Sequence, residues 1–134
     1  MKTAPGVYKS KAAVDAAIME KDPTGKGFDI STSVFKSSTS PAQINYRVRR
    51  GVELAHSMHP DSEVNFIVDG SAVVTTGGTL PTDPNSKEGI KDGVEHQVAK
   101  GDWLIVPAGT AHFWSKINGS VTYIQMRLGD EQKK

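Results

Sequence analysis

The sequence contains no cysteine, which excludes a disulfide scaffold, a thiolate metal site and a cysteine nucleophile. Long hydrophobic runs are also missing. The longest, such as Trp103 to Val106, are far too short to cross a bilayer, and the N-terminus lacks the apolar stretch of a secretory signal. We therefore expect a soluble protein with no membrane segment. It would be cytoplasmic or, if a leader was removed before residue 1, periplasmic.

An excess of charge of one sign is missing as well. The chain has 16 Lys plus Arg against 15 Asp plus Glu, a net charge of +1, and like charges never run beyond a pair. We therefore expect neither nucleic acid nor an anionic membrane as a partner. The partners that remain are a small-molecule substrate or ligand and a second copy of the chain, so we expect a homodimer. At 134 residues, the chain has the size of one domain.

One helix is predicted, followed only by short strands. Residues 10–21 place apolar side chains at helical spacing after Ser10, a competent N-cap, and Pro23 with Gly25 ends the helix. From residue 28, segments rich in Val, Ile, Thr and aromatics alternate with Gly, Pro, Asp and Asn. Strands are expected at 29–35, 44–50, 52–56, 63–68, 72–76, 94–99, 103–106, 111–116 and 121–128.

Because no helices separate these strands, the pattern favours an all-β barrel or sandwich over βαβ units. We expect a single domain, with a helical arm at about 1–27, a barrel at about 28–128 and a frayed tail at 129–134. The long insertion 77–93 is rich in Gly and Pro and is interpreted as a lid or a plain solvated loop.

Histidine is scarce and lies beside strand ends. The chain has four histidines, and His59 shares a short window with Glu63. Imidazole and carboxylate together offer ligands to iron, manganese, zinc, nickel or copper. In a straight strand, His59 and Glu63 would lie roughly 13 Å apart, too far for one ion. The intervening Pro60-Asp61-Ser62 is a turn-former, so the chain can fold back there and bring the two side chains together.

A second corner follows further along the chain. In GDWLIVPAGTAH, residues 101–112, Gly101-Asp102 makes a turn and 103–106 a buried strand. The reversal at 107–109 then delivers His112 onto the next strand. Two such corners can present ligands to one point.

The other two histidines are less clear candidates. His56 has the opposite strand parity to His59, so in a regular strand its side chain faces away from the barrel interior. A bulge at Ser57-Met58 would turn it inward, so His56 is a ligand in one alternative and not in the other. His96 lies in an alternating strand before a turn, where a surface or supporting role is expected rather than ligation.

Two segments carry a resemblance to the cupin family. Residues 51–70, GVELAHSMHPDSEVNFIVDG, look like the first cupin motif, with the His-Pro turn, the Glu and the glycine seven residues after it. Residues 101–112 are similar to the second motif almost letter for letter. The two motifs and the variable-length region between them, residues 51–112, span about half the chain. The resemblance implies a jelly-roll barrel, a cupin-type double-stranded β-helix, with one short N-terminal helix.

The resemblance also implies one divalent metal ion inside the barrel. Carried over by position, the ligands are His59, Glu63 and His112. The motif's first histidine falls on Ser57, with His56 beside it as a fourth candidate ligand, and Lys116 stands where the family often has Asn. The N-terminal helix and the ending GSVTYIQMRL resemble small single-domain bacterial cupins.

Several other residues are candidates for binding a substrate. Asn65 shares the parity of Glu63, and Trp114 shares that of His112; either can equally be structural. Tyr123, Gln125 and Arg127 form one face of the last strand, which lines the cavity or meets solvent. The basic strand at 46–50 is interpreted as a solvated edge protected by charge rather than an anion site.

The pattern favours a metal-dependent enzyme with Glu63 as ligand or catalytic base, acting on a small organic molecule by oxygenase, isomerase or lyase chemistry. The alternatives are a non-catalytic module that binds a small molecule or a metal, and a structural dimer with a degenerate site.

Overall fold

The structure, a computed structural model, describes residues 1–51, 57–83, 86 and 88–130. The strand predicted at 52–56 and the end of the tail lie outside the described residues. The elements are α1 (Lys11–Lys21), β1 (Asp29–Lys36), β2 (Gln43–Arg49), β3 (Glu63–Thr76), β4 (Val94–Ala99), β5 (Trp103–Val106) and β6 (His112–Arg127). The chain is therefore all-β with one short helix, as predicted. Among the described residues, no helix has the length and hydropathy needed to cross a membrane.

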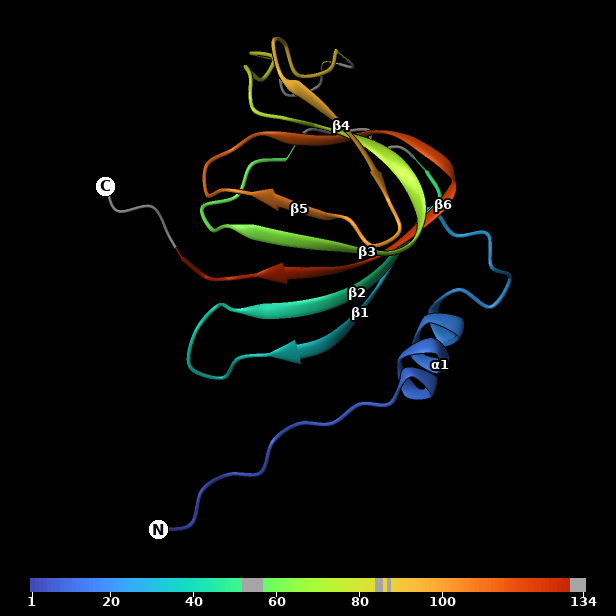
Figure 1. Cartoon of the computed structure of the whole chain (residues 1–134), viewed down its shortest axis with the longest axis vertical. Helices are drawn as coiled ribbons and strands as arrows, with labels where there is room; N and C mark the ends of the chain where they lie inside the picture. The colour runs from blue at the N-terminus through green and yellow to red at the C-terminus, as the bar shows by residue number, and fades with distance from the viewer. Residues whose placement is uncertain (52–56, 84–85, 87, 131–134) are drawn as a thin grey trace.

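Two long strands, β3 and β6, build the barrel by pairing antiparallel along their whole length. The first half of β3 and the second half of β6 form one layer in the order β1-β2-β6-β3, with β5 on the far side of β3. The other halves of β3 and β6 form the second layer with β4. In Figure 1, the strands curl round from one layer into the other.

At two places where the sequence predicts that one strand ends and another begins, a single strand bends and continues. The segments predicted at 63–68 and 72–76 are one strand, and so are those at 111–116 and 121–128. Gly70 has a φ of +80°, and the register of β3 against β6 shifts between Gly70 and Ala72. The glycine therefore turns the strand from one layer to the next without ending it, as a β-bulge does.

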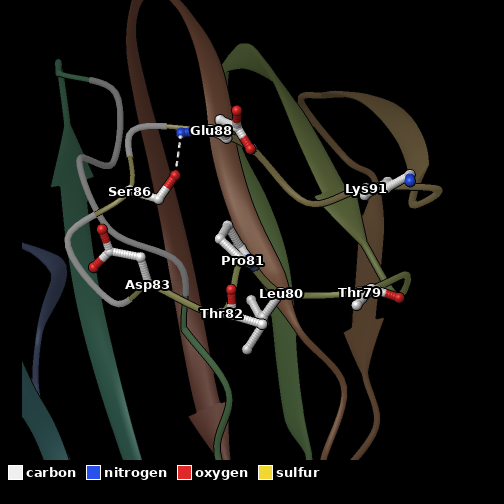
Figure 2. Close-up of a pocket in the computed structure, with 9 residues that line it drawn as sticks. Thr79, Leu80, Pro81, Thr82, Asp83, Ser86, Glu88 and Lys91 are labelled. Carbon is white, nitrogen blue, oxygen red and sulfur yellow. Dashed lines mark hydrogen bonds between the residues drawn. The ribbon is translucent and has the colours of Figure 1, made fainter.

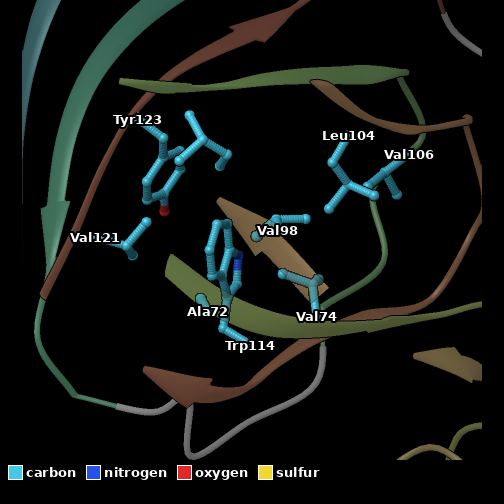
Figure 3. Close-up of a cluster of buried hydrophobic side chains, with 9 residues drawn as sticks. Ala72, Val74, Val98, Leu104, Val106, Trp114, Val121 and Tyr123 are labelled. Carbon is cyan, nitrogen blue, oxygen red and sulfur yellow. The ribbon is translucent and has the colours of Figure 1, made fainter. Parts of the chain in front are cut away.

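One end of the barrel interior is apolar. Figure 3 shows side chains from β3, β4, β5 and β6 pointing toward one another across the interior. The rings of Trp114 and Tyr123 stack at its centre, with centroids 4.6 Å apart and planes 26° apart. The cluster comprises Ile67, Ala72, Val74, Val98, Leu104, Val106, Trp114, Val121 and Tyr123.

The helix lies beside β1, the edge strand of its layer (Figure 1). The Ser10 side chain accepts a hydrogen bond from the Ala13 backbone N–H, which confirms Ser10 as the N-cap. Lys9 and Lys21 donate to the carbonyls of Ser33 and Ser31, at 3.1 and 2.6 Å. These lysines occupy edge carbonyls that would otherwise be open to pairing with another strand.

The interpretation of the basic strand at 46–50 as a solvated edge is wrong. Strand β2 lies between β1 and β6, so it is an interior strand of the layer. Arg47 is in register with Tyr123, which is fully buried, and Arg49 is 5% exposed. Arg47 and Arg49, two positions apart on β2, share the face that points into the barrel, and Asp29 contacts both guanidinium groups.

Candidate metal centre

Three predicted ligands meet at the polar end of the barrel. One ligand atom from each of His59, Glu63 and His112 lies within 4.8 Å of the other two. Glu63 Oε2 is 3.7 Å from His112 Nε2, and the two imidazole rings have centroids 5.2 Å apart. Glu63 is 2% exposed and His112 is 4% exposed. Glu63 begins β3 and His112 begins β6, so the two residues come from different layers.

The two corners of the chain are held together by backbone hydrogen bonds. Ser57 and His112 exchange N–H···O bonds of 3.1 and 2.9 Å, and the Gly109 N–H donates to the His59 carbonyl at 2.8 Å.

Between His59 and Glu63 the chain folds back, as its turn-forming residues predict, and Asp61 accepts a 2.6 Å bond from Arg127. This bond lowers the pKa of Asp61, so the turn keeps its ion pair under mildly acidic conditions.

The Glu63 carboxylate is held by two amides. Its Oε1 accepts from Gln125 Nε2 at 2.6 Å, and its Oε2 accepts from Asn65 Nδ2 at 3.2 Å. Asn65 is 1% exposed, and Gln125 is also buried. Donors of this kind fix the orientation of a ligating carboxylate.

The two histidines are set up to offer nitrogen lone pairs. Burial lowers the pKa of His59, with further lowering by Arg127 and by His112, so the neutral imidazole that binds metals persists to lower pH. His112 Nδ1 lies 3.4 Å from the Thr110 carbonyl. A proton on Nδ1 then leaves Nε2, the nitrogen nearer Glu63, free to act as a ligand.

This donor set fits a divalent transition metal ion. Two imidazoles and one carboxylate suit iron, zinc, manganese, nickel or copper, and they leave coordination positions open. Ligand atoms bound about 2.1 Å from one ion lie roughly 3–4 Å apart. The 3.7 Å between Glu63 and His112 is within that range.

The other predicted site residues lie in three different places. His96 Nε2 lies 2.8 Å from Thr76 Oγ1 on the adjacent strand, and His96 is not in the three-residue group. His56 lies outside the described residues, so its ligation stays a prediction. Trp114 and Tyr123 lie in the apolar cluster, and burial raises the pKa of Tyr123. Asn65 and Gln125 contact Glu63, and the prediction that these four residues bind substrate remains open.

Sequence reasoning missed Arg47, which donates to Gln125 Oε1 at 3.4 Å and so lies one amide away from Glu63. Tyr46 and Val48 point to the outer face and Arg47 points inward. The alternation of β2 separates these two faces, but it does not by itself identify the inner one.

A separate pocket of about 320 Å³ lies in the 77–93 segment. Figure 2 shows its lining, with the Glu88 N–H donating to Ser86 Oγ. A bridge between Thr79 and Lys91 gives the segment a short hairpin-like base. None of the three candidate metal ligands lines this pocket.

The comparisons with known proteins bear on the fold. No protein-family model matches the sequence, and no curated protein matches it either. Solved structures do match. A cupin superfamily protein from Desulfitobacterium hafniense is 20% identical, with a TM-score of 0.57 over 76% of this chain and 78% of that one. The chain has the cupin fold.

Two further cupin-fold neighbours are related to enzymes by name. A mannose-6-phosphate isomerase-like protein from Ralstonia eutropha is 19% identical, with a TM-score of 0.60 over 78% of this chain and 88% of that one. HppE bound to Fe(II) is 12% identical, with a TM-score of 0.60 over 75% of this chain and 51% of that one. HppE has also been solved with Co(II). At these identities, the likeness establishes the cupin barrel and not the reaction.

Proposed function

We propose that this cupin barrel binds one divalent transition metal ion through His59, Glu63 and His112 and acts as an enzyme on a small organic molecule. The observation that carries the proposal is the convergence of three ligand atoms within 4.8 Å of one another around a buried carboxylate. The metal-bound neighbour HppE supports it. When bound, the ion supplies Lewis-acid or oxygen-binding chemistry.

The residues of this chain prepare the site. Gln125 and Asn65 hold the Glu63 carboxylate in one orientation, so little reorganisation is needed when a cation arrives. Burial keeps His59 neutral and limits the water around the reacting groups. Glu63 also has the position and chemistry to hold a proton taken from a bound substrate.

A non-catalytic binding module is the second candidate. It is favoured by Ser57, which stands where the cupin motif places its first histidine and supplies no imidazole. A barrel with fewer protein ligands can hold a metal or a small ligand without turning it over.

The two functions differ in turnover. The metal-loaded protein would be incubated with a panel of small oxygenated and aromatic compounds, under air and under nitrogen. Substrate loss would be followed by liquid chromatography coupled to mass spectrometry, which also separates isomers of equal mass. We expect at least one compound to be consumed. Loss that requires oxygen identifies an oxygenase, and loss under nitrogen an isomerase or lyase. Binding without turnover would favour the module. A purified protein with under about 0.2 ion per chain, without exposure to a chelator, would contradict the metal-dependent enzyme and support a structural dimer with a degenerate site.

We also propose that the outer face of the β1-β2-β6-β3-β5 layer binds a second copy of this chain. Trp103 and Ile105 on this face are 60% and 52% exposed. Two in-register rows of apolar side chains cross the layer: Phe35, Ile44, Met126, Val64 and Ile105 in one, and Tyr46, Ile124, Phe66 and Trp103 in the other. The rows contain no charged residue. At about 4.8 Å per strand spacing, the row across five strands spans roughly 19 Å and the row across four strands roughly 14 Å.

An exposed apolar face of this kind can pack against the same face of a second copy, so two copies related by a two-fold axis would close into a dimer. We expect light scattering coupled to size exclusion to give the mass of a dimer for the wild type. The variant Trp103→Glu/Ile105→Glu should give a monomer, whereas Val94→Glu, a change at an exposed valine on β4, should remain dimeric. A monomeric wild type, or a dimeric double variant, would refute the assignment.

A further inference from the structure

Two arginines project into the barrel interior from β2. Arg47 Nη2 donates to both carboxylate oxygens of Asp29, at 2.8 and 2.7 Å, and Arg49 Nη2 lies 3.4 Å from the same carboxylate. The Arg47 guanidinium also lies 5.9 Å from the centre of the Tyr123 ring. Guanidinium groups are seldom buried without a specific partner, so their placement beside the candidate metal centre calls for a reason.

Arg47 is connected to the candidate metal ligand Glu63 through one side chain, that of Gln125. Its Nη1 donates to Gln125 Oε1 at 3.4 Å, and Gln125 Nε2 donates to Glu63 Oε1 at 2.6 Å. Arg47, Gln125 and Glu63 lie on β2, β6 and β3, which are adjacent in the sheet (Figure 1). A molecule bound at Glu63 would therefore reach the guanidinium across a single side chain.

Two buried polar atoms beside this chain of contacts lack a hydrogen-bond partner among the described residues: Arg47 Nε, a donor, and Asn65 Oδ1, an acceptor. Asn65 is almost fully buried, and its Nδ2 already donates to Glu63 and to the Leu104 carbonyl. Its oxygen is therefore left for another donor. A ligand with an acceptor for Arg47 and a hydroxyl for Asn65 would satisfy both atoms.

The charge of the centre favours an anion. Asp29 pairs with both Arg47 and Arg49, and Asp61 balances Arg127. A divalent ion (+2) held by Glu63 (−1) and two neutral imidazoles keeps a net charge of +1. An anionic group beside it would be attracted by the ion and by the guanidinium in a site of low dielectric.

We propose that Arg47 binds the oxyanion group, carboxylate or phosphoryl, of a small hydroxylated substrate whose hydroxyl faces Asn65 and the metal ligands. This inference rests on the proposed metal-dependent function and adds the class of substrate to it. Arg47 Nη2 is paired with Asp29 and Nη1 donates to Gln125, so Nε is the donor left for a ligand. A charge-assisted hydrogen bond from Nε to an oxyanion is stronger than one to a neutral alcohol or amide oxygen.

The test is calorimetric titration of Zn(II)-loaded protein with lactate, its neutral analogue lactamide, and methylphosphonate. We expect lactate or methylphosphonate to bind at least about ten-fold more tightly than lactamide, because a charge-assisted bond to Arg47 is lost with the amide. A preference for lactate alone points to carboxylates, and one for methylphosphonate alone to phosphoryl groups. Equal binding of all three would overturn the proposal.

Variants assign the preference to Arg47. Arg47→Gln should reduce it to about two-fold or less, and Arg47→Lys, which keeps the charge but not the planar fork, should give an intermediate value. Arg50→Gln is the matched control, because Arg50 pairs with Asp22 and Gly27 rather than with the metal centre, and should keep the full preference. Full preference in Arg47→Gln would overturn the assignment.

Metal content and circular dichroism measured on the same samples separate the two proposals. Full metal content without any anion preference refutes the anion site alone. If the wild type retains no metal, the metal-dependent function fails, and the same ligands are titrated against the metal-free protein. A preference for the anion that disappears in Arg47→Gln then still supports the anion site, and its absence refutes it.

Discussion

Replacing His112 by alanine is expected to reduce bound metal from about one ion per chain to below about 0.1 after dialysis. The change removes one of three ligands from a buried site and leaves the Glu63 carboxylate without the imidazole that lies 3.7 Å away. The Glu63→Gln variant should behave similarly, because it keeps the shape of the side chain but removes its charge. Elemental analysis by mass spectrometry measures both results.

The histidine on β4 provides the control. His96 bonds to Thr76 and is not part of the three-residue group, so His96→Ala should keep the wild-type metal content. Circular dichroism would confirm that each variant is folded. If His112→Ala retained a full ion, the metal would be bound elsewhere in the chain and the proposed centre would be wrong.

Gly70→Ala is expected to lower the free energy of unfolding by about 3 kcal/mol or more and the Tm by roughly 10 °C. Gly70 has a φ of +80°, which a residue with a Cβ adopts at a cost. A Cβ at this position would also collide with the backbone carbonyl oxygen of Ser120 on β6. Since backbone cannot rotate away as a side chain can, β3 and β6 would have to separate at the bend.

Gly77→Ala separates these two effects. Gly77 has nearly the same φ, +77°, but a Cβ there would meet no atom within 4 Å. We expect this variant to lose only about 1–2 kcal/mol from backbone strain. Thermal and denaturant unfolding of both variants measure the difference. Equal losses would show that the close contact with Ser120 does not limit stability.

The features that the sequence predicts correctly are those that depend on residues close together in the chain. The Ser10 cap, the bounds of β4 and β5 and the all-β class follow from local spacing and turn chemistry, and the structure confirms them. The turn at residues 60–62 likewise brings His59 toward Glu63. The sequence predicts strand ends where β3 and β6 only bend, because a glycine is typical both of a turn that ends a strand and of a bend within one.

Contacts between distant residues could not be predicted in this way. Gln125 and Glu63 are 62 positions apart, and their contact depends on the register of two strands that only the closed barrel fixes. The arginines of β2 were misjudged for a related reason. Alternation separates two faces of a strand, but it does not identify the inner face when that face is itself polar.

The origin of Glu63 and His112 in different layers has a consequence for folding. An ion bound to both would join segments 49 residues apart. Because the unfolded chain does not hold these ligands together, the ion would bind the folded chain preferentially and stabilise it. The layers would then be harder to part when metal is abundant than when it is scarce. Resistance to heat would follow the supply of the ion, and so the cell's metal status would influence how long each molecule survives.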